Sequence, residues 1–541
     1  MSEEQTLAAR TGQRHPRALA PANLALTVVV SVFGAIIGMQ ILVNLGISAN
    51  TSLIGALVAM VLARVPMSLF SSYRSIHSQN LVQSAISSAT FGAANGLLLP
   101  IGIPWALGRP DLVVPMFCGV AAAMIVDAVM LYRLFDTKVF PASGAWPPGI
   151  AAAEAIQAGD KGGRRAGLLG IGVVVGAAGS ALGIPMSAFG VAFIGNIVAM
   201  VMFGLGLLMR QYQTQLFGGD FFATIIPKGN LAEAYVPHGF MIGAGLVALV
   251  QVGVQLARRN SEGGGTSRSD ADMRRTLGLG SVAYVLIAVF LALICGLWTD
   301  MSAGMLVAFV LYAGFAALVH ELIVGLAAMH AGWFPAFAVA LITLIIGMII
   351  GFPLEALVVL VAFSAATGPA FADMGYDLKA GFILRGHGAD AEFELAGRRQ
   401  QLISAMIAFG IAIAVVLVMW ESYFSRDLLP PVDRVFAATM HGGISPHVAM
   451  SLAIWAVPGA IVQLVGGSKR QAGILLATGL LVSQPSAGWA VLAGIVIRFA
   501  WLRLRSEKAR SEMEVVAGGV IAGDALFSFG QSTLKSLAGK G

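Results

Sequence analysis

Ionisable side chains interrupt several long apolar runs of this sequence. His320 and Glu321 lie inside the apolar run 306–329, and Asp127 lies inside an earlier one. A charged side chain at the centre of a lipid bilayer costs at least about 2.5–3.5 kcal/mol, so such residues usually face a cavity or a polar partner. Burial stabilises the neutral form of a carboxyl or an imidazole, and either group can then exchange a proton near neutral pH. We therefore predict these three residues as proton-coupling groups. The alternatives are that His320 and Glu321 form a structural polar pair and that Asp127 forms an ion pair with Arg133.

A stripe of neutral polar side chains lies in the segment 79–96. Most of its members recur at spacings of three or four residues, which places them on one face of a helix. We predict the following as substrate-binding residues: Asn80, Gln83, Ser84, Ser87, Thr90 and Asn95. A face of neutral hydrogen-bonding groups suits a zwitterionic or metal-chelating substrate. The alternative is that these small polar residues hold neighbouring helices together.

Two further segments carry candidate substrate contacts. Trp146 precedes a Pro-Pro pair that can begin a helix, and Gly149 lies in the first turn of that helix. The N-terminus of such a helix could present backbone N–H groups to a carboxylate, or the helix could lie on the membrane surface as a linker. Gln484 lies between two short apolar segments. This pattern predicts that Gln484 lies at the tip of a re-entrant hairpin beside a cavity. The alternative is an ordinary loop between two short spans.

The composition explains why these polar residues need partners. The chain has 541 residues, of which 57% are hydrophobic and only 11% are charged, whereas soluble proteins carry about 25% charged residues. The mean hydropathy is +0.84. This much apolar surface predicts an all-α polytopic integral membrane protein. The formal net charge of +6 is typical of basic cytoplasmic loops and does not indicate nucleic-acid binding.

The sequence lacks the motifs of several common classes of enzyme and metal site. There is no GxxxxGK[ST] phosphate loop, so we do not expect an ATP-driven pump. HExxH, GxSxG and CxxC motifs are also absent, and the histidines show no clear metal-ligand spacing. Cys118 and Cys295 imply no disulfide framework. We expect no enzyme activity, no cofactor and no protein metal site.

The apolar runs are long enough for about 14–16 membrane spans, at roughly 20 residues each. In the first half we place them at 21–46, 50–70, 81–107, 112–134, 165–185, 187–209 and 234–257. In the second half we place them at 277–298, 303–328, 333–351, 354–371, 401–423, 446–465, 471–484, 487–503 and 514–531. The predicted organisation is a tail (1–20), a first half (21–257), a polar linker (258–276), a second half (277–531) and a tail (532–541).

The distribution of Lys and Arg predicts the orientation of the chain. Arginines precede the first run, which is too long for a cleaved signal peptide, so we place the N-terminus in the cytoplasm. Seven spans cannot join a cytoplasmic N-terminus to a cytoplasmic linker. Either 216–228 supplies another crossing or the linker lies outside. An internal repeat is also expected, because Gly-Arg-Arg and Pro-Pro patterns recur in both halves at 163–165 and 397–399 and near 147 and 430.

Sequence motifs spread along the chain resemble those of the oligopeptide transporter (OPT) superfamily, which includes the yellow-stripe-like metal-chelate carriers. Asn80-Leu81-Val82-Gln83-Ser84 is similar to an N-[IL]-V-Q-[ST] helix of that superfamily, and 140–159 is similar to its Pro- and Gly-rich segment. The segments 236–245, 377–381, 398–401 and 430–443 resemble further motifs, most closely those of bacterial members. Several bacterial members carry a glutamate where Thr90 stands here. The resemblance therefore implies that any proton coupling uses other groups.

The resemblance implies a secondary transporter with broken or re-entrant helices, driven by a proton gradient, in the cytoplasmic membrane. Relatives carry short peptides, glutathione-like compounds or metal chelates. We predict symport of short oligopeptides, and metal-chelate uptake is the alternative. The expected partners are the small-molecule substrate and membrane lipid, and the large apolar surface is compatible with a homodimer. From other classes, a channel would need a continuous pore, and a membrane enzyme would need a catalytic constellation, which the sequence does not contain.

Overall fold

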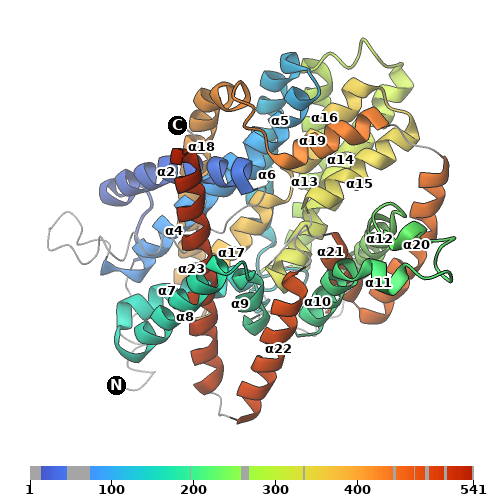
Figure 1. The fold of residues 1–541 in the computed structure, drawn as a ribbon. Coiled ribbons are helices and arrows are strands. Elements are labelled where there is room, and N and C mark those ends of the chain that lie inside the picture. The colour runs from blue at the N-terminus through green and yellow to red at the C-terminus, as the bar shows by residue number, and fades with distance from the viewer. Residues whose placement is uncertain are drawn as a thin grey trace.

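A computed structural model describes residues 14–45, 74–194, 197–257, 267–332, 336–442, 446–467, 470–481, 486–504 and 508–538. These residues are almost entirely helical (Figure 1), and their one β-type contact is an isolated bridge between Phe135 and Phe140. The first half contains α2 (Pro21–Leu45), α4 (Ile76–Phe91), η2 (Gly92–Leu98), α5 (Leu99–Ala106), η3 (Pro110–Leu112), α6 (Val113–Leu134), α7 (Pro147–Lys161), α8 (Gly163–Ala181), α9 (Met186–Ile194), α10 (Ile197–Gln211), α11 (Gln213–Phe217), η4 (Pro227–Gly229) and α12 (Val236–Ala257). The second half contains α13 (Asp270–Ile294), α14 (Ala303–Ala331), α15 (Ala336–Ile350), α16 (Leu354–Ala366), α17 (Pro369–Leu384), α18 (Ala391–Phe424), α19 (Pro431–Gly442), α20 (Pro446–Gly466), α21 (Ala472–Leu481), α22 (Ala487–Leu504) and α23 (Lys508–Ala538).

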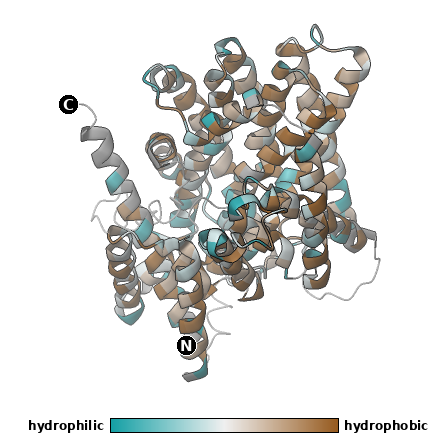
Figure 2. Cartoon of the chain, turned by 45° about the vertical axis from the view of Figure 1, so that its right-hand side comes forward, coloured by the Kyte–Doolittle hydropathy of each residue, from teal (hydrophilic) through white to brown (hydrophobic). Residues whose placement is uncertain are grey.

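Eight helical stretches in the described ranges are long and apolar enough to cross a membrane. Four shorter apolar helices accompany them, in α10, α12, α15 and α21. Hydrophobic residues make up much of most helices (Figure 2), and many of them are exposed, among them Val250, Val418 and Val465, which are 65–81% exposed. This surface suits lipid contact, and the predicted all-α polytopic fold is confirmed. The count of 14–16 spans stays a prediction, because it needs the shorter helices and the segment 50–70, which lies outside the described residues.

Most predicted spans coincide with helices, and two local predictions are wrong. The segment 216–228 forms the end of the short helix α11 and a series of turns, so it supplies no extra crossing. The span predicted at 354–371 is broken at Thr367 and Gly368 and continues as α17 to Leu384. Asp377 and Lys379, which the sequence places in a loop, therefore lie inside a buried helix.

Polar caps explain where several long helices begin. Ser269 precedes α13 and forms a capping box with Asp272, in which each side chain accepts a backbone N–H of the other residue. Ser302 caps α14 by accepting from the backbone N–H of Met305, and Asp390 caps α18 in the same way. These caps satisfy N–H groups that the first helical turn leaves without partners. Both Pro-Pro patterns also begin helices, α7 and α19.

Two broken spans form the most buried part of the fold. One runs from Ile76 to Ala106 through α4, η2 and α5, and the other runs from Leu354 to Leu384 through α16 and α17. They pack antiparallel, because α4 contacts α17 and α5 contacts α16. The first span contains a π-helical turn at η2, just before Pro100, which has no N–H to donate. The second is interrupted at Gly368, whose φ of 98° only glycine adopts readily.

Helices of the two sequence halves interleave through close glycine contacts. Figure 1 shows α8 beside α23 and α12 beside α20. A Cβ at Gly176 of α8 would lie 2.2 Å from the backbone carbonyl of Val520, and a Cβ at Gly523 of α23 would lie 2.1 Å from that of Val173. Gly172 and Gly519 make similar contacts, so each helix carries a Gly-x-x-x-Gly face. In a bilayer, this close approach supplies the packing energy that the hydrophobic effect cannot.

We expect Gly176→Leu to destabilise the protein. Its side chain would overlap a backbone carbonyl of α23, which cannot move aside cheaply, and overpacking of this kind costs about 1–3 kcal/mol. The midpoint of thermal unfolding in detergent measures the effect. Gly170→Leu is the matched control on the same helix, because no atom lies within 4 Å of a Cβ there. Equal midpoints for the two variants would contradict the packing described here.

Candidate functional site

Two carboxylates lie where the broken spans face each other. Asp373 and Asp377 are one turn apart on α17, and neither side chain is exposed. The Gln83 amide of α4 donates to Asp377 Oδ1 at 2.6 Å, and the Ser87 hydroxyl donates to Asp373 Oδ1. Ser88 Oγ lies 3.3 Å from Asp373 Oδ2 and 3.4 Å from Asp377 Oδ2. One hydroxyl hydrogen cannot serve both carboxylates at once, so the two acids compete for it.

No cation neutralises this carboxylate pair in the described part of the chain. The ammonium nearest in sequence belongs to Lys379, and it donates to the carbonyl of Ala142 at 2.8 Å. Two adjacent buried charges without a counter-ion are strongly unfavourable. The pair is therefore best satisfied when it holds at least one proton, which makes Asp373 and Asp377 a proton-binding site in chemical terms.

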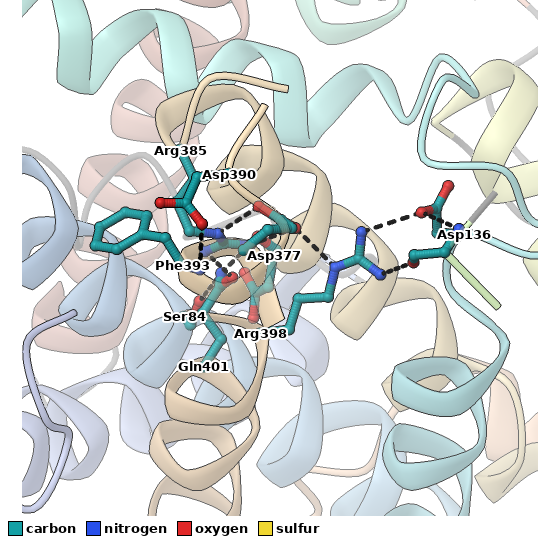
Figure 3. A network of polar contacts seen from close by, with 10 residues as sticks. Ser84, Asp136, Asp377, Arg385, Asp390, Phe393, Arg398 and Gln401 are labelled. Carbon is teal, nitrogen blue, oxygen red and sulfur yellow. Dashed lines mark hydrogen bonds and ion pairs between the residues drawn. The ribbon is translucent and has the colours of Figure 1, made fainter. Parts of the chain in front are cut away.

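Gln401 of α18 connects this site to a network of charges. Its amide nitrogen donates to the backbone carbonyl of Asp377 at 2.6 Å and to Ser84 Oγ at 3.1 Å. Its carbonyl oxygen accepts from Arg385 Nη1 at 2.8 Å. Figure 3 shows this chain of contacts leading from Ser84 and Asp377 to the arginines. The carboxylate pair is thus linked through a single glutamine to the end of the bundle.

Two arginines and two carboxylates make up that network. Glu394 accepts from Arg385 Nε at 2.7 Å and from Arg398 Nε at 2.7 Å. Arg398 also reaches Asp136 at 3.3 Å and Ser267 Oγ at 3.0 Å. Burial opposes ionisation of Asp136, but hydrogen bonds from Ser267 and the Arg398 charge hold its pKa below the usual value. The network ties the loop after α6 and the segment before α13 to α17 and α18.

This network lies at one end of the central spans. His77, at the start of α4, packs against Phe393 near the start of α18, with ring centroids 5.0 Å apart. At the other end, Trp105 of α5 packs against Trp420 near the end of α18, at 5.9 Å. The broken span of α4 and α5 and the helix α18 therefore run in the same direction. The charge network and Trp105 lie at opposite ends of the bundle. The network therefore joins α17 and α18 at the end of the central spans that lies away from Trp105.

His15 lies at the same end of the bundle, and it gives a pH-dependent prediction. Its ring packs against His77 and Phe393, and its Nδ1 contacts the carbonyl of Pro16. Burial lowers the pKa of His15 to about 4, against the pull of the Pro16 carbonyl. Because the unfolded chain binds a proton below about pH 6.5, stability is full above that value and falls between pH 6.5 and 4, by about 3 kcal/mol.

The dependence of the unfolding midpoint on pH tests this effect. His15→Phe keeps the ring packing and removes the titrating nitrogen, so we expect the slope between pH 6.5 and 4 to flatten. His441→Gln, at an exposed histidine, should keep the wild-type slope. An unchanged slope in His15→Phe would show that other groups cause the loss of stability.

Asp127 holds the start of α17. Its Oδ1 accepts from the Tyr284 hydroxyl at 2.6 Å, and its Oδ2 accepts from the backbone N–H of Gly368 at 2.5 Å. The alternative of an ion pair with Arg133 is wrong for the described residues, because Asp127 is fully buried while Arg133 is exposed and forms no ion pair with it. A carboxylate at the N-terminus of the half-helix α17 is electrostatically favourable. Asp127 thus connects α6, α13 and the break in the second broken span.

Glu321 and His320 lie close to the same break. Neither is exposed, and neither carboxylate oxygen of Glu321 makes a hydrogen bond within the described ranges. Glu321 lies near Tyr284, whose single hydroxyl hydrogen already goes to Asp127. A contact between Glu321 and Tyr284 therefore needs a proton on the carboxyl. His320 of α14 points instead to α16, where its Nδ1 contacts the carbonyl of Ser364.

The predicted stripe faces α17 and α18, except at its far end. Ser84, Ser87 and Gln83 join the carboxylate site, and Asn80 donates to Gln83 Oε1 at 2.8 Å. Thr90 instead donates to backbone carbonyls at Gly34 and Ile86, which is helix packing. Asn95 is buried in η2. Gln484 lies outside the described residues.

Trp146 and Gly149 pack against α17 at Tyr376. The Trp146 ring is fully buried against Tyr376, with centroids 6.1 Å apart, and its Nε1 has no partner among the described residues. A Cβ at Gly149 would lie 2.4 Å from the carbonyl of Tyr376, so this glycine permits close packing. The N–H groups of Gly149 and Ile150 donate to the carbonyl of Trp146. A substrate carboxylate would have to displace these bonds.

Asp373 and Asp377 are not among the residues predicted from the sequence for this site. The predicted span ends at residue 371, which leaves both carboxylates outside it. An Asp-x-x-x-Asp spacing places both carboxylates on one helix face. That signal is readable once the helix is extended to Leu384.

The fold and this site define an all-α polytopic integral membrane protein whose central broken helices enclose buried carboxylates. The chain belongs to the OPT oligopeptide transporter protein family, whose profile matches residues 19–258 and 262–535. The short gap in the match falls within the predicted linker. A search among curated proteins gave no match. Membership of the OPT superfamily is thereby confirmed, and the family is one of transporters. The yellow-stripe-like and bacterial-type affinities stay predictions.

Proposed function

We propose that this protein is a secondary transporter that carries short oligopeptides across the cytoplasmic membrane together with protons. The observation that carries the proposal is the pair Asp373 and Asp377, buried without a cation between two broken spans and hydrogen-bonded to a polar helix face. Transporters place substrate and coupling-ion sites at discontinuous helices of this kind. The proton gradient is the proposed driving force, and no cofactor is needed.

The proposed coupling groups form a row through the centre of the fold. Asp373 and Asp377 occupy α17, Asp127 binds the start of that helix, and Glu321 lies near Asp127 across Tyr284. Protonation of an acid in this row removes a buried charge and weakens its hold on the neighbouring helix. Proton binding and helix movement are coupled in this way, which is what symport requires. The polar groups of α4 and the Trp146 turn are the proposed substrate contacts.

Metal-chelate uptake remains the second candidate. No group of three or more His, Cys, Asp or Glu side chains in the described ranges could hold a bare metal ion. A metal would therefore travel inside its chelator, as substrate. A channel, the candidate from another class, would show conductance without saturation. The proposed setting is the cytoplasmic membrane with the N-terminus inside, in contact with lipid and compatible with a homodimer.

Uptake into proteoliposomes under an inward proton gradient tests the proposal. Labelled di- to tetrapeptides and iron chelates are compared in the same preparation. Saturable peptide uptake that a protonophore abolishes is expected. Preferred uptake of the chelate would replace the peptide by the second candidate, and non-saturating flux would favour a channel.

A further inference from the structure

A cavity of about 410 Å³ lies at the end of the bundle opposite the charge network. It is bounded by the end of α5, the turn after α18 and one face of α19. Its lining includes Trp105, Asp427, Leu429, Arg434, Ala437 and His441. Its volume is within the range of about 300–1,000 Å³ that small-molecule sites occupy. Aromatic, cationic and anionic side chains are all present, so its chemistry suits a polar ligand with charges of both signs.

Asp433 is a buried carboxylate beside this cavity that the fold does not explain. It is not exposed, and neither of its oxygens has a hydrogen-bond partner among the described residues. It packs against α5 at Gly102, where a Cβ would lie 2.0 Å from Asp433 Oδ2. A buried polar group without a partner is costly, and native proteins retain few of them. A cationic group of a bound ligand would satisfy the Asp433 carboxylate.

The surroundings of Asp433 supply no such partner. The guanidinium of Arg434 donates to Asp427 at 2.8 Å. On α16, which also packs against α19, Glu355 pairs with Arg109. Burial raises the pKa of Asp433 well above its usual range, and Arg434 offsets only part of that rise. The raised pKa favours the neutral form of the Asp433 carboxyl, and a bound cation would favour its ionised form.

Access from the cavity to Asp433 passes Leu429. Ala437, one turn after Asp433 on α19, lines the cavity, so the two residues share a helix face. Leu429 lines the cavity and also lies against Gly102, where its Cδ2 would be 3.5 Å from a Cβ. A rotation of the Leu429 side chain would join Asp433 to the cavity. The Arg434 side chain lines the cavity and is half exposed.

We propose that this cavity is a docking site for short zwitterionic peptides, in which Asp433 takes the N-terminal ammonium and Arg434 takes the C-terminal carboxylate. The proposal rests on the transport function proposed above, because it makes the cavity the first contact with the transported substrate. The opposite end of the bundle carries the buried Arg385 and Glu394 network. With the N-terminus in the cytoplasm, the docking site faces the outside.

Equilibrium binding of tritiated trialanine to the purified full-length protein tests the site. The peptide is compared with its N-acetyl and C-amide forms, each of which removes one charge. For the wild type, either modification is expected to weaken binding at least about tenfold. In Asp433→Asn, free trialanine should bind as weakly as the N-acetyl form, and acetylation should cost nothing more. Arg434→Gln should show the same pattern with the C-amide form.

Matched variants separate this effect from general damage. Asp300→Asn and Arg426→Gln remove charges outside the cavity and should bind like the wild type. His441→Trp keeps both charges and enlarges an exposed side chain that lines the cavity, so it should lose binding with a normal unfolding midpoint. This variant also decides the matter if Asp433→Asn does not fold.

The proposal would be overturned by wild-type affinity in Asp433→Asn with full sensitivity to N-acetylation. Absence of wild-type binding to trialanine would overturn it as well. Its failure is distinguishable from failure of the transport function. Saturable wild-type uptake with an unchanged KM in both charge variants would remove the docking site and leave transport standing, whereas loss of all wild-type uptake would remove transport itself.

Discussion

Replacing Asp377 by asparagine is expected to reduce strongly the accumulation of substrate driven by a proton gradient. Asparagine keeps the size of the side chain and its place beside Gln83, but it cannot bind and release a proton. Coupling free energies of 1–3 kcal/mol correspond to about 5–150-fold effects, so we expect gradient-driven uptake to fall at least about tenfold. Exchange of labelled for unlabelled substrate, which needs no net proton movement, should persist. Both rates are measured in the same proteoliposomes.

Asp373→Asn should behave in the same way, because Ser88 links the two acids. Asp220→Asn is the control, since Asp220 lies on an exposed turn. Loss of exchange together with uptake would indicate a substrate contact instead of a coupling role. Wild-type accumulation in both central variants would transfer coupling to Asp127, His320 or Glu321, and the corresponding variants of those residues would then be decisive.

Replacing Arg385 by alanine is expected to cause the largest loss of stability. The Arg385 side chain has no exposure, and its partner Glu394 is only 4% exposed. Removing Arg385 leaves the buried Glu394 with Arg398 as its remaining arginine partner, and breaking a buried ion pair costs up to about 3–5 kcal/mol. The same change removes the contact to Gln401 and so loosens this end of the bundle. We expect a lower midpoint of thermal unfolding and faster leak of preloaded substrate from proteoliposomes.

Arg164→Ala is the matched control for this variant. Arg164 also pairs with a glutamate, Glu512, but its side chain is 75% exposed. Exposed pairs contribute about 0–1 kcal/mol, so stability should hardly change. Similar losses in Arg164→Ala and Arg385→Ala would show that burial of the network does not matter. A stable Arg385→Ala protein without leak would contradict the prediction that the network holds this end of the bundle together.

The sequence predicts the spans well, because apolar length is what a bilayer demands. Helices α2, α6, α12 and α20 begin and end within a few residues of the predicted boundaries. The breaks are harder to predict. The π-helical turn at η2 and the interruption at Gly368 depend on how the two spans pack against each other, which no local pattern encodes.

The candidate site shows the same division between local and tertiary information. The stripe on α4 was found from its spacing, and most of its members do lie together. Its partners on α17 were missed, because charges at a predicted span end look like a loop. The partners of Asp127 come from residues more than 150 positions away. The two Gly-Arg-Arg triplets differ too, since Arg164 is exposed and Arg398 is buried.

Joint movement of substrate and protons is tested most directly by the internal pH of proteoliposomes when peptide is added outside, with no pH gradient imposed and with the membrane potential clamped. We predict internal acidification that saturates with peptide concentration and is absent in Asp377→Asn. Peptide uptake without any change of internal pH would contradict this coupling.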